Sequence, residues 1–201
     1  METTTIIEVN TSTEELKKWL LRLQYLSQRN EREWRKYFLR NKMWIEDIES
    51  IGYLLTKSHE SVVYKGYSEK EVFKVKQARG ADCVFISTIM SAIYHNQLFP
   101  ETFYKLVGFT DCANGVAVVL SQKFVKGNHP SNEQIIEYLK GNGFDVSKDG
   151  DMITACKDGY CARDIQKINA IIADSKVFVI DCNISYWDIR LPDFANFSKI
   201  I

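Results

Sequence analysis

The sequence lacks the features that mark several large classes of protein. None of its apolar runs approaches the roughly 18 residues of a membrane helix, and its first ten residues lack the positive and apolar regions of a signal peptide. Lysine plus arginine equals aspartate plus glutamate at 26 each, so no overall positive charge attracts nucleic acid. We therefore expect a cytoplasmic protein that binds neither a membrane nor nucleic acid.

Histidine and cysteine are too scattered to indicate a zinc site. The three histidines show neither HxxxH nor HExxH spacing, and the five cysteines include no CxxC pair. His95 is interpreted as a hydrogen-bonded structural residue, and no feature of the sequence supports a Cys–His nucleophile pair. Cys156 and Cys161 flank an Asp-Gly turn and could approach across it, but reduced thiols are the expected state in a cytosolic protein.

The chain has enough apolar residues for an ordered domain, because 45% of its 201 residues are hydrophobic and 12% are aromatic. The segment from Ser12 to about Glu49 is predicted to be helical, and Ser12 with Glu15 forms a capping-box pattern. Two helices or one long bent helix both fit. We expect the aromatic stripe of this segment to pack on the rest of the chain, and the alternative is a partner-binding helix.

The most informative segment is residues 162–183, ARDIQKINAIIADSKVFVIDCN. It is predicted to form a short loop, a tight hairpin around Asp174–Ser175, and a buried strand that ends at Asp181. Asp164 and Asn169 lie five residues apart in the loop. This is the layout of a protein-kinase active site, in which one aspartate orients a hydroxyl nucleophile while an asparagine and a second aspartate hold magnesium. The hairpin would return the chain so that these oxygen ligands converge on one ion.

A second segment, residues 60–76, predicts a hairpin whose second strand carries a lysine. Lys74 stands where a strand lysine contacts the α- and β-phosphates of ATP. Lys76 lies on the same face by the two-residue period of a strand, so it is a rival. The alternative is that both lysines are solvated on an edge strand. In the kinase-like reading we expect Lys74 and Asp181 to be exposed in a polar cleft.

The stretch between these segments predicts a strand, a hinge, a helix and hairpins. Val116–Leu120 is a near-continuous apolar strand, and Gln122 and Phe124 lie in the hinge that follows, whose backbone groups would recognise adenine. Ser131–Lys140 is predicted to be a short helix capped by its first residue. Between residues 144 and 160, two Asp-Gly dipeptides indicate short hairpins in place of a long helix.

Five runs precede the segment at 162–183 in a distinctive order: SHESVVYKG, VFKVK, YHNQLFPETFYKLVGF, VVLSQKFVKG and NGFDV. Together with Asp164, Asn169 and Asp181, they resemble the compact polyvalent protein kinase domain family of bacterial mobile elements and phage-related polyvalent proteins. The resemblance covers roughly residues 51–195. It implies an α+β, minimal two-lobed protein-kinase-like fold with a truncated C-lobe and an N-terminal helical extension.

The resemblance also implies domains and a function. The domains are a helical extension at residues 1–50, a kinase-like N-lobe with its hinge at 51–127, and a truncated C-lobe with the catalytic loop at 128–201. The function is ATP- and magnesium-dependent transfer of a phosphoryl group to a hydroxyl of a protein or small molecule. Its ligands are therefore a nucleotide, Mg²⁺, and a protein substrate or partner.

By the same resemblance, four residues carry the chemistry. Lys74 steadies the phosphates, Asp164 orients or deprotonates the acceptor hydroxyl, and Asn169 and Asp181 bind magnesium. Gln166 stands where many protein kinases have a phosphate-contacting lysine, and Ala162, Cys182 and Asn183 also depart from the usual kinase motifs.

Two further departures bear on activity. Thr56, Ser58 and Ser61 occupy the glycine positions of the phosphate loop, where Ser58 and Ser61 could offer hydroxyls to phosphates instead. The helix glutamate that pairs with the strand lysine has no obvious counterpart, and Asp82 or Glu71 are its possible substitutes. The alternatives to an active kinase are therefore a pseudokinase or interaction module without turnover, and a structural element of a larger polyvalent polypeptide.

Overall fold

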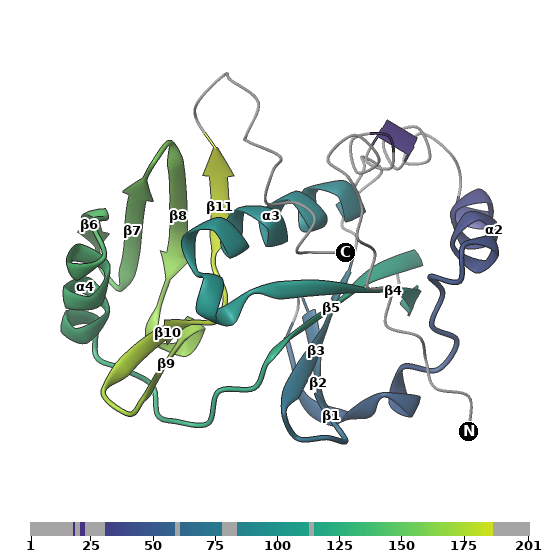
Figure 1. Ribbon diagram of the computed structural model, residues 1–201, viewed down its shortest axis with the longest axis horizontal. Coiled ribbons are helices and arrows are strands. Elements are labelled where there is room, and N and C mark those ends of the chain that lie inside the picture. Colours follow the sequence, from purple (N-terminus) through teal and green to yellow (C-terminus); the bar gives the residue numbers. More distant parts are fainter. Residues whose placement is uncertain are drawn as a thin grey trace. The chain divides into compact units, whose positions relative to one another are not determined.

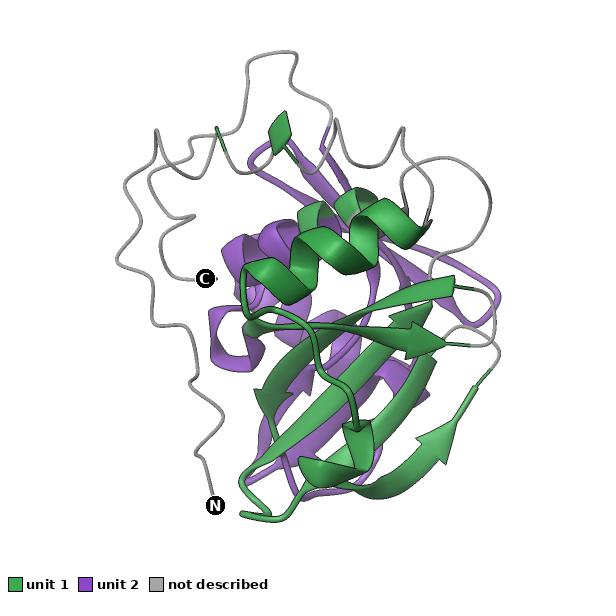
Figure 2. Cartoon of the chain, turned by 90° about the vertical axis from the view of Figure 1, so that its right-hand side faces the viewer, with its two compact units in different colours: residues 1–90, 104–124, 194–201 green, residues 91–103, 125–193 purple. Residues whose placement is uncertain are grey.

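The computed structural model describes most of the chain between residues 31 and 186, and the described residues are 18, 21–22, 31–58, 61–77, 84–112 and 115–186. The chain divides into two compact units, shown in Figure 2. Unit 1 comprises residues 1–90, 104–124 and 194–201, and unit 2 comprises residues 91–103 and 125–193. The predicted domain boundaries at residues 50 and 127 remain a prediction.

Unit 1 is built around a five-stranded antiparallel sheet with the strand order β1-β2-β3-β5-β4 (Figure 1). Its strands are β1 (Gly52–Lys57), β2 (Ser61–Gly66), β3 (Glu71–Gln77), β4 (Tyr104–Cys112) and β5 (Gly115–Lys123). The hairpin expected at residues 60–76 is therefore present as β2 and β3. Strand β3 lies between β2 and β5, so the reading of its two lysines as edge-strand residues is wrong.

One face of this sheet carries a small apolar core. Side chains alternate between the two faces of a strand, and Phe73 and Val75 of β3 meet Ala117 and Val119 of β5 in one buried cluster. The same alternation places Lys74 on the opposite face. The position of Lys74 therefore follows from the strand assignment alone.

Helix α2 (Glu31–Arg40) stops before Glu49, to which the expected helical segment extended. It ends where Lys42 adopts a positive φ of 57°. The next residues bond to strand β4 instead, since Ile45 donates to the carbonyl of Phe109 at 2.8 Å and Phe109 donates to that of Met43 at 2.8 Å. This pairing overrides the helical spacing of the apolar residues. The expected capping box at Ser12 lies outside the described residues.

Helix α2 packs on unit 1 through Phe38 and Arg35. Phe38 is fully buried, and its ring stacks on Phe109 of β4 with a centroid separation of 3.6 Å. The guanidinium of Arg35 lies 5.0 Å from the centre of the Trp44 ring. These contacts agree with internal packing of this part of the expected helical extension.

Unit 2 combines a four-stranded antiparallel sheet, in the order β11-β8-β7-β6, with a two-stranded hairpin of β9 and β10. The strands are β6 (Asp145–Asp149), β7 (Met152–Lys157), β8 (Tyr160–Ile165), β9 (Ala170–Ala173), β10 (Lys176–Val179) and β11 (Asn183–Tyr186). Its helices are α4 (Asn132–Gly141), the C-terminal part of α3 (Val84–Leu98), and the short 3-10 helices η2 (Pro100–Thr102) and η3 (Lys167–Asn169).

Local signals in the sequence correctly predicted several of these elements. Ser131 caps α4 in a reciprocal capping box with Gln134. The turn at Asp158–Gly159 and the turn at Asp174–Ser175 both have positive φ at their two central residues, as two-residue hairpin turns require. The unit closes over a buried apolar cluster to which α4 contributes Ile135 and Leu139.

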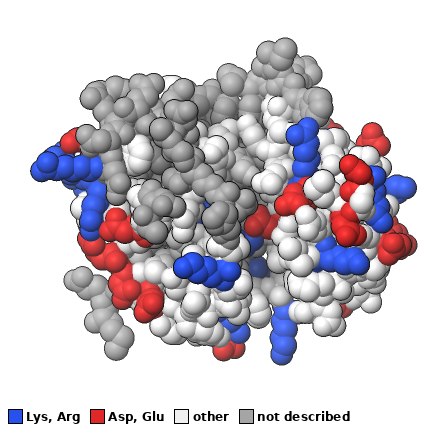
Figure 3. All heavy atoms as spheres, turned by 180° about the vertical axis from the view of Figure 1, so that it is seen from behind, with Lys and Arg blue, Asp and Glu red and all other residues white. Residues whose placement is uncertain are grey.

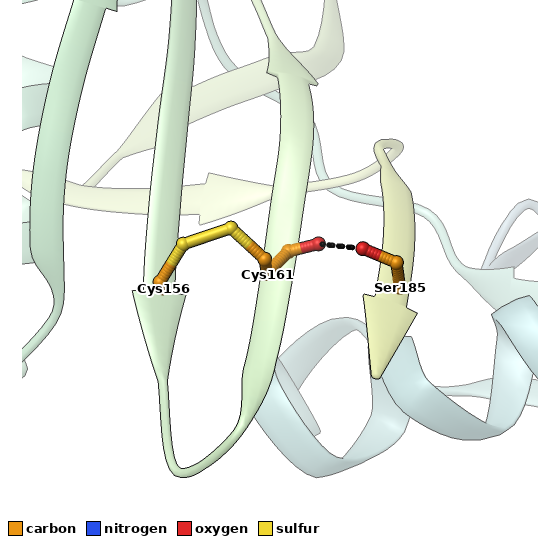
Figure 4. The surroundings of a disulfide bond; sticks show 3 residues. All are labelled: Cys156, Cys161 and Ser185. Carbon is orange, nitrogen blue, oxygen red and sulfur yellow. Dashed lines mark hydrogen bonds between the residues drawn. A yellow bond between two sulfur atoms is a disulfide. The ribbon is translucent and has the colours of Figure 1, made fainter. Parts of the chain in front are cut away.

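A disulfide joins Cys156 and Cys161 (Figure 4), so the expectation that these thiols are reduced is wrong. The two residues are direct partners across the β7–β8 hairpin, with Cα atoms 4.1 Å apart. The Asp158–Gly159 turn sets this register, and the hydroxyl of Ser185 on β11 donates to the Cys161 carbonyl at 3.5 Å.

Positive and negative side chains are interspersed over the described residues on the face shown in Figure 3. This mixture follows the equal numbers of basic and acidic residues in the sequence. Among the described helices, none combines the length and the apolar character needed to cross a membrane.

The stacked pair of Phe38 and Phe109 generates a stability prediction. Phe38→Ala should lower the free energy of unfolding by about 3–5 kcal/mol, because it leaves a cavity against a fully buried ring. Leu39→Ala, one residue away and 45% exposed, should change it by less than about 0.5 kcal/mol. Urea denaturation followed by circular dichroism would compare the two, and equal losses would show that α2 does not dock through Phe38.

Candidate functional site

Strand β8 places Asp164 one residue before its end. The sequence predicted a loop here, but Ala162, Arg163 and Ile165 pair with neighbouring strands. Asp164 lies at the irregular step of the β7–β8 pairing and takes a positive φ of 61°. A left-handed conformation is costly for a residue other than glycine, and such residues cluster at functional sites. The backbone of Asp164 is therefore held in a strained conformation at this irregularity.

Asn169, the last residue of η3, connects the other two candidate residues. Its side-chain amide donates to the Asp164 carbonyl at 2.9 Å. Its own carbonyl accepts from the backbone N–H of Ile180 at 2.9 Å and of Asp181 at 3.3 Å. The structure thus brings Asp164, Asn169 and Asp181 together in unit 2 through direct hydrogen bonds.

The oxygen atoms of Asn169 and Asp181 suit a hard cation such as Mg²⁺. The Asn169 amide nitrogen is bonded to Asp164, which leaves its side-chain oxygen for a cation. Asp181 is half-buried, and its Oδ1 accepts the N–H of Cys182 at 3.0 Å. Within the described ranges, no three His, Cys, Asp or Glu side chains cluster as a metal site. A cation here would therefore also need ligands from a bound molecule.

Gln166 has a contact that sequence reasoning missed. Its side-chain amide donates to Oδ1 of Asp164. The sequence comparison with kinases placed Gln166 at a phosphate-contacting position, whereas the structure uses it to orient the carboxylate. The only signal in the sequence was its place two residues after Asp164.

In unit 1, Lys74 is buried at 5% exposure, so the expectation that it is exposed in a polar cleft is wrong. Its ammonium donates to the hydroxyl of Tyr104 at 2.8 Å and lies 5.1 Å from the centre of that ring. The ammonium of Lys76 is 5.9 Å from the same ring centre. Burial and the direct hydrogen bond favour Lys74 over Lys76 as the functional lysine.

Tyr104 could not be identified from the sequence as a neighbour of Lys74. It reaches that lysine across two strand pairings, because Lys74 is opposite Leu120 and Leu120 is opposite Leu106. Tyr104 is two residues before Leu106 and therefore lies on the same face. Glu71 is three residues from Lys74 and faces the other side of β3, and Asp82 lies outside the described residues.

The two predicted phosphate-binding serines, Ser58 at the end of β1 and Ser61 at the start of β2, bond to each other. The hydroxyl of Ser58 accepts from the N–H of Ser61 at 3.1 Å and donates to the Ser61 carbonyl at 3.1 Å. The backbone N–H of Ser58 also donates to that carbonyl, at 2.8 Å. The groups that would bind a phosphate therefore bond to one another, and Thr56 pairs with Val63 in the sheet.

The predicted hinge residues lie at the end of β5. Gln122 is buried at 3% exposure and pairs with Val72 on one side and Tyr104 on the other. The backbone N–H of Phe124 donates to the Lys70 carbonyl at 2.9 Å. The ammonium of Lys65 lies 4.5 Å from the centre of the Phe124 ring.

The residues after the hinge belong to unit 2 and are held against β9. Asn128 and Ile172 exchange backbone hydrogen bonds of 3.1 and 2.7 Å, and Nδ1 of His129 lies 3.0 Å from the Ala170 carbonyl. Gly127 is required here because a Cβ atom would lie 2.2 Å from the Ile172 carbonyl oxygen. This segment and the β9–β10 hairpin therefore form one packed group.

The candidate residues fall into two sets. Lys74, Ser58, Ser61, Gln122 and Phe124 belong to unit 1, and Asp164, Asn169 and Asp181 belong to unit 2. Each set is defined by contacts within its own unit.

Comparison with known proteins identifies one family. The model of the family described as "Serine/Threonine/Tyrosine Kinase found in polyvalent proteins" matches residues 27–187 of this chain. A search of curated proteins finds no match.

The contact between Lys74 and Tyr104 can be tested by removing one oxygen atom. Tyr104→Phe should lower the free energy of unfolding by about 1 kcal/mol, because a buried hydrogen bond is lost while the ring remains. Tyr53→Phe, at a side chain that is 42% exposed, is the matched control and should have no measurable effect. Equal stabilities of both variants and the wild type would contradict a stabilising contact at Tyr104.

Proposed function

This chain belongs to the family of serine/threonine/tyrosine kinases found in polyvalent proteins, and from that premise we propose that it is an ATP- and magnesium-dependent phosphotransferase acting on a hydroxyl acceptor. The observation that carries the proposal is the hydrogen-bonded set of Asp164, Asn169 and Asp181. These are the residue types that protein kinases use to orient the acceptor and to hold magnesium.

Asp164 would act on the acceptor. Gln166 occupies Oδ1 of its carboxylate, so Oδ2 is the atom that takes the proton of the incoming hydroxyl. As the hydroxyl oxygen bonds to the γ-phosphorus, the bond from that phosphorus to the β–γ bridging oxygen breaks, and its electron pair leaves with ADP. The hydrogen bond from Gln166 would help to keep the carboxylate in one orientation during this exchange.

Asn169 and Asp181 would hold magnesium through their side-chain oxygens, and the bound ion would neutralise charge on the phosphates. In unit 1, Lys74 would contribute a positive charge to the phosphates of a nucleotide. Its hydrogen bond to Tyr104 restricts the ammonium to one position, which reduces the entropy lost when a nucleotide binds.

One observation favours a pseudokinase as the second candidate function. The Ser58–Ser61 turn bonds its own polar groups to one another, so a phosphate must displace these bonds before it can reach the backbone amides. Phosphoryl transfer depends mostly on positioning and charge neutralisation. The hydrogen bonds between Ser58 and Ser61 would therefore slow phosphoryl transfer more than they would weaken nucleotide binding.

Nucleotide binding is tested by thermal stability. ATP with MgCl₂ should stabilise the protein, by about 2.7 kcal/mol at a hundredfold excess over Kd. Asp181→Asn should remove only the magnesium-dependent part, whereas Lys74→Met should weaken the response to ATP both in MgCl₂ and in EDTA. Asp174→Asn, the same change in the exposed β9–β10 turn, is the control and should respond like the wild type.

No stabilisation of the folded wild type at millimolar ATP with MgCl₂ would remove both the kinase and the nucleotide-binding pseudokinase. A response of Asp181→Asn equal to that of the wild type would reject its role as a magnesium ligand.

Catalysis is tested with labelled ATP and magnesium. We expect slow transfer to generic substrates, and Asp164→Ala should lower the rate by about a hundredfold or more, because it removes the general base. Asp145→Ala, at an exposed position of β6, should retain the wild-type rate. Binding of ATP without any transfer that depends on Asp164 would assign the protein to the pseudokinases.

A further inference from the structure

The segment that carries Asp181 is held on both sides by one buried turn. Residues 180–182 connect β10 to β11, and the turn in contact with them runs from the end of α3 into η2. His95 and Thr102, both 1% exposed, are its buried polar side chains. An exposed ion pair between Glu101 of η2 and Lys176 of β10 joins the same two parts of the chain.

Thr102 holds the residue two positions before Asp181. Its hydroxyl donates to the carbonyl of Val179 at 2.6 Å. With that proton engaged, the hydroxyl oxygen can only accept from Nε2 of His95, which lies 3.2 Å away. The Thr102 carbonyl, a second acceptor, lies 3.1 Å from the same nitrogen. Two acceptors around Nε2 mean that this nitrogen carries the hydrogen.

His95 in turn holds the residue directly after Asp181. In a neutral imidazole with hydrogen on Nε2, the other nitrogen is an acceptor. The sulfur of Cys182 lies 3.7 Å from Nδ1, so the thiol donates to the ring. The backbone N–H of Cys182 donates to Oδ1 of Asp181 at 3.0 Å. The position of Cys182 therefore affects the position of the Asp181 carboxylate through this hydrogen bond.

These contacts form one directed chain of hydrogen bonds, which we name the Asp181 clamp. It runs from the Cys182 thiol to His95, from His95 to Thr102, and from the Thr102 hydroxyl to Val179. All four residues are buried, with exposures of 6%, 1%, 1% and 1%.

Apolar side chains would fill the same space without the cost of burying polar groups. Directional bonds add a defined geometry, since a fully satisfied polar network specifies one arrangement of its surroundings. The clamp acts on both flanks of Asp181, while the Asn169 carbonyl accepts the N–H of Asp181 itself.

We propose that His95 is a positioning residue for Asp181, acting through Cys182 and Thr102 to aim the carboxylate at the magnesium of bound ATP. The inference rests on the proposed function and extends it to a residue that the sequence marked as merely structural. Residues that orient metal ligands commonly change metal affinity by roughly tenfold to a hundredfold when they are replaced.

The test measures the dissociation constant of ATP in EDTA and in MgCl₂. The dissociation constant in EDTA divided by that in MgCl₂ reports the contribution of magnesium to ATP binding. A general loss of stability does not change this ratio. His95→Phe keeps a ring of similar size beside Phe99 but removes both polar contacts. We expect it to lower the ratio by roughly tenfold or more, with the constant in EDTA unchanged.

A matched pair at Cys182 separates hydrogen bonding from packing. Cys182→Ser keeps a donor for Nδ1 and should retain most of the wild-type ratio, whereas Cys182→Ala removes the donor and should behave like His95→Phe. Thr102→Val, of similar shape without the hydroxyl, serves if His95→Phe does not fold, and should also lower the ratio. Ile135→Val, in the same buried apolar cluster as Cys182, is the control for lost stability and should leave the ratio unchanged.

The outcomes distinguish this inference from the function on which it rests. A wild-type ratio of one overturns magnesium-dependent binding, and the positioning role falls with it. A wild-type ratio well above one, with the same value in folded His95→Phe, Thr102→Val and Cys182→Ala, overturns the positioning role alone. Equal ratios in Cys182→Ser and Cys182→Ala, both below the wild type, would assign Cys182 a packing role and also contradict the clamp.

Discussion

The arrangement of unit 2 depends on one backbone carbonyl, that of Asn169. It accepts two N–H groups from the end of the β9–β10 hairpin, and a carbonyl oxygen has two lone pairs for this purpose. The same hairpin sends Ala170, Val177 and Val179 into the apolar core. Core packing and the placement of Asp181 therefore have a common cause, because any shift of the hairpin would break the carbonyl contacts and open the core together.

Unit 1 combines features that favour nucleotide binding with one that opposes rapid turnover. Lys74 is buried in a central strand and oriented by Tyr104, which suits a charge that must meet phosphates in one place. Ser58 and Ser61 are hydrogen-bonded to each other, so a phosphate would have to displace these bonds to reach their polar groups. Under the proposed function, the balance between these two features would decide between an active kinase and a pseudokinase.

Sequence reasoning succeeded where a few neighbouring residues determine the structure. The hairpin turns and the Ser131 cap of α4 depend on local conformational preference, and both were predicted. It failed where distant segments compete with local pattern. Helix α2 ends at Arg40 because the next residues pair with β4. The expected reduced state of Cys156 and Cys161 failed for another reason, since it was inferred from the expected compartment and not from the hairpin register that places them opposite each other.

By itself the sequence determined the order of the elements and the candidates Lys74, Asp164, Asn169 and Asp181, because residue type, strand period and turn spacing are properties of short segments. Tertiary structure decided which side chains form hydrogen bonds with the candidate residues or with their neighbours in the chain. The partnership of Tyr104 with Lys74 required the register of three strands, and that of His95 with Cys182 joined residues 87 positions apart. No local pattern contains such contacts, since they arise only when separate elements pack into one core.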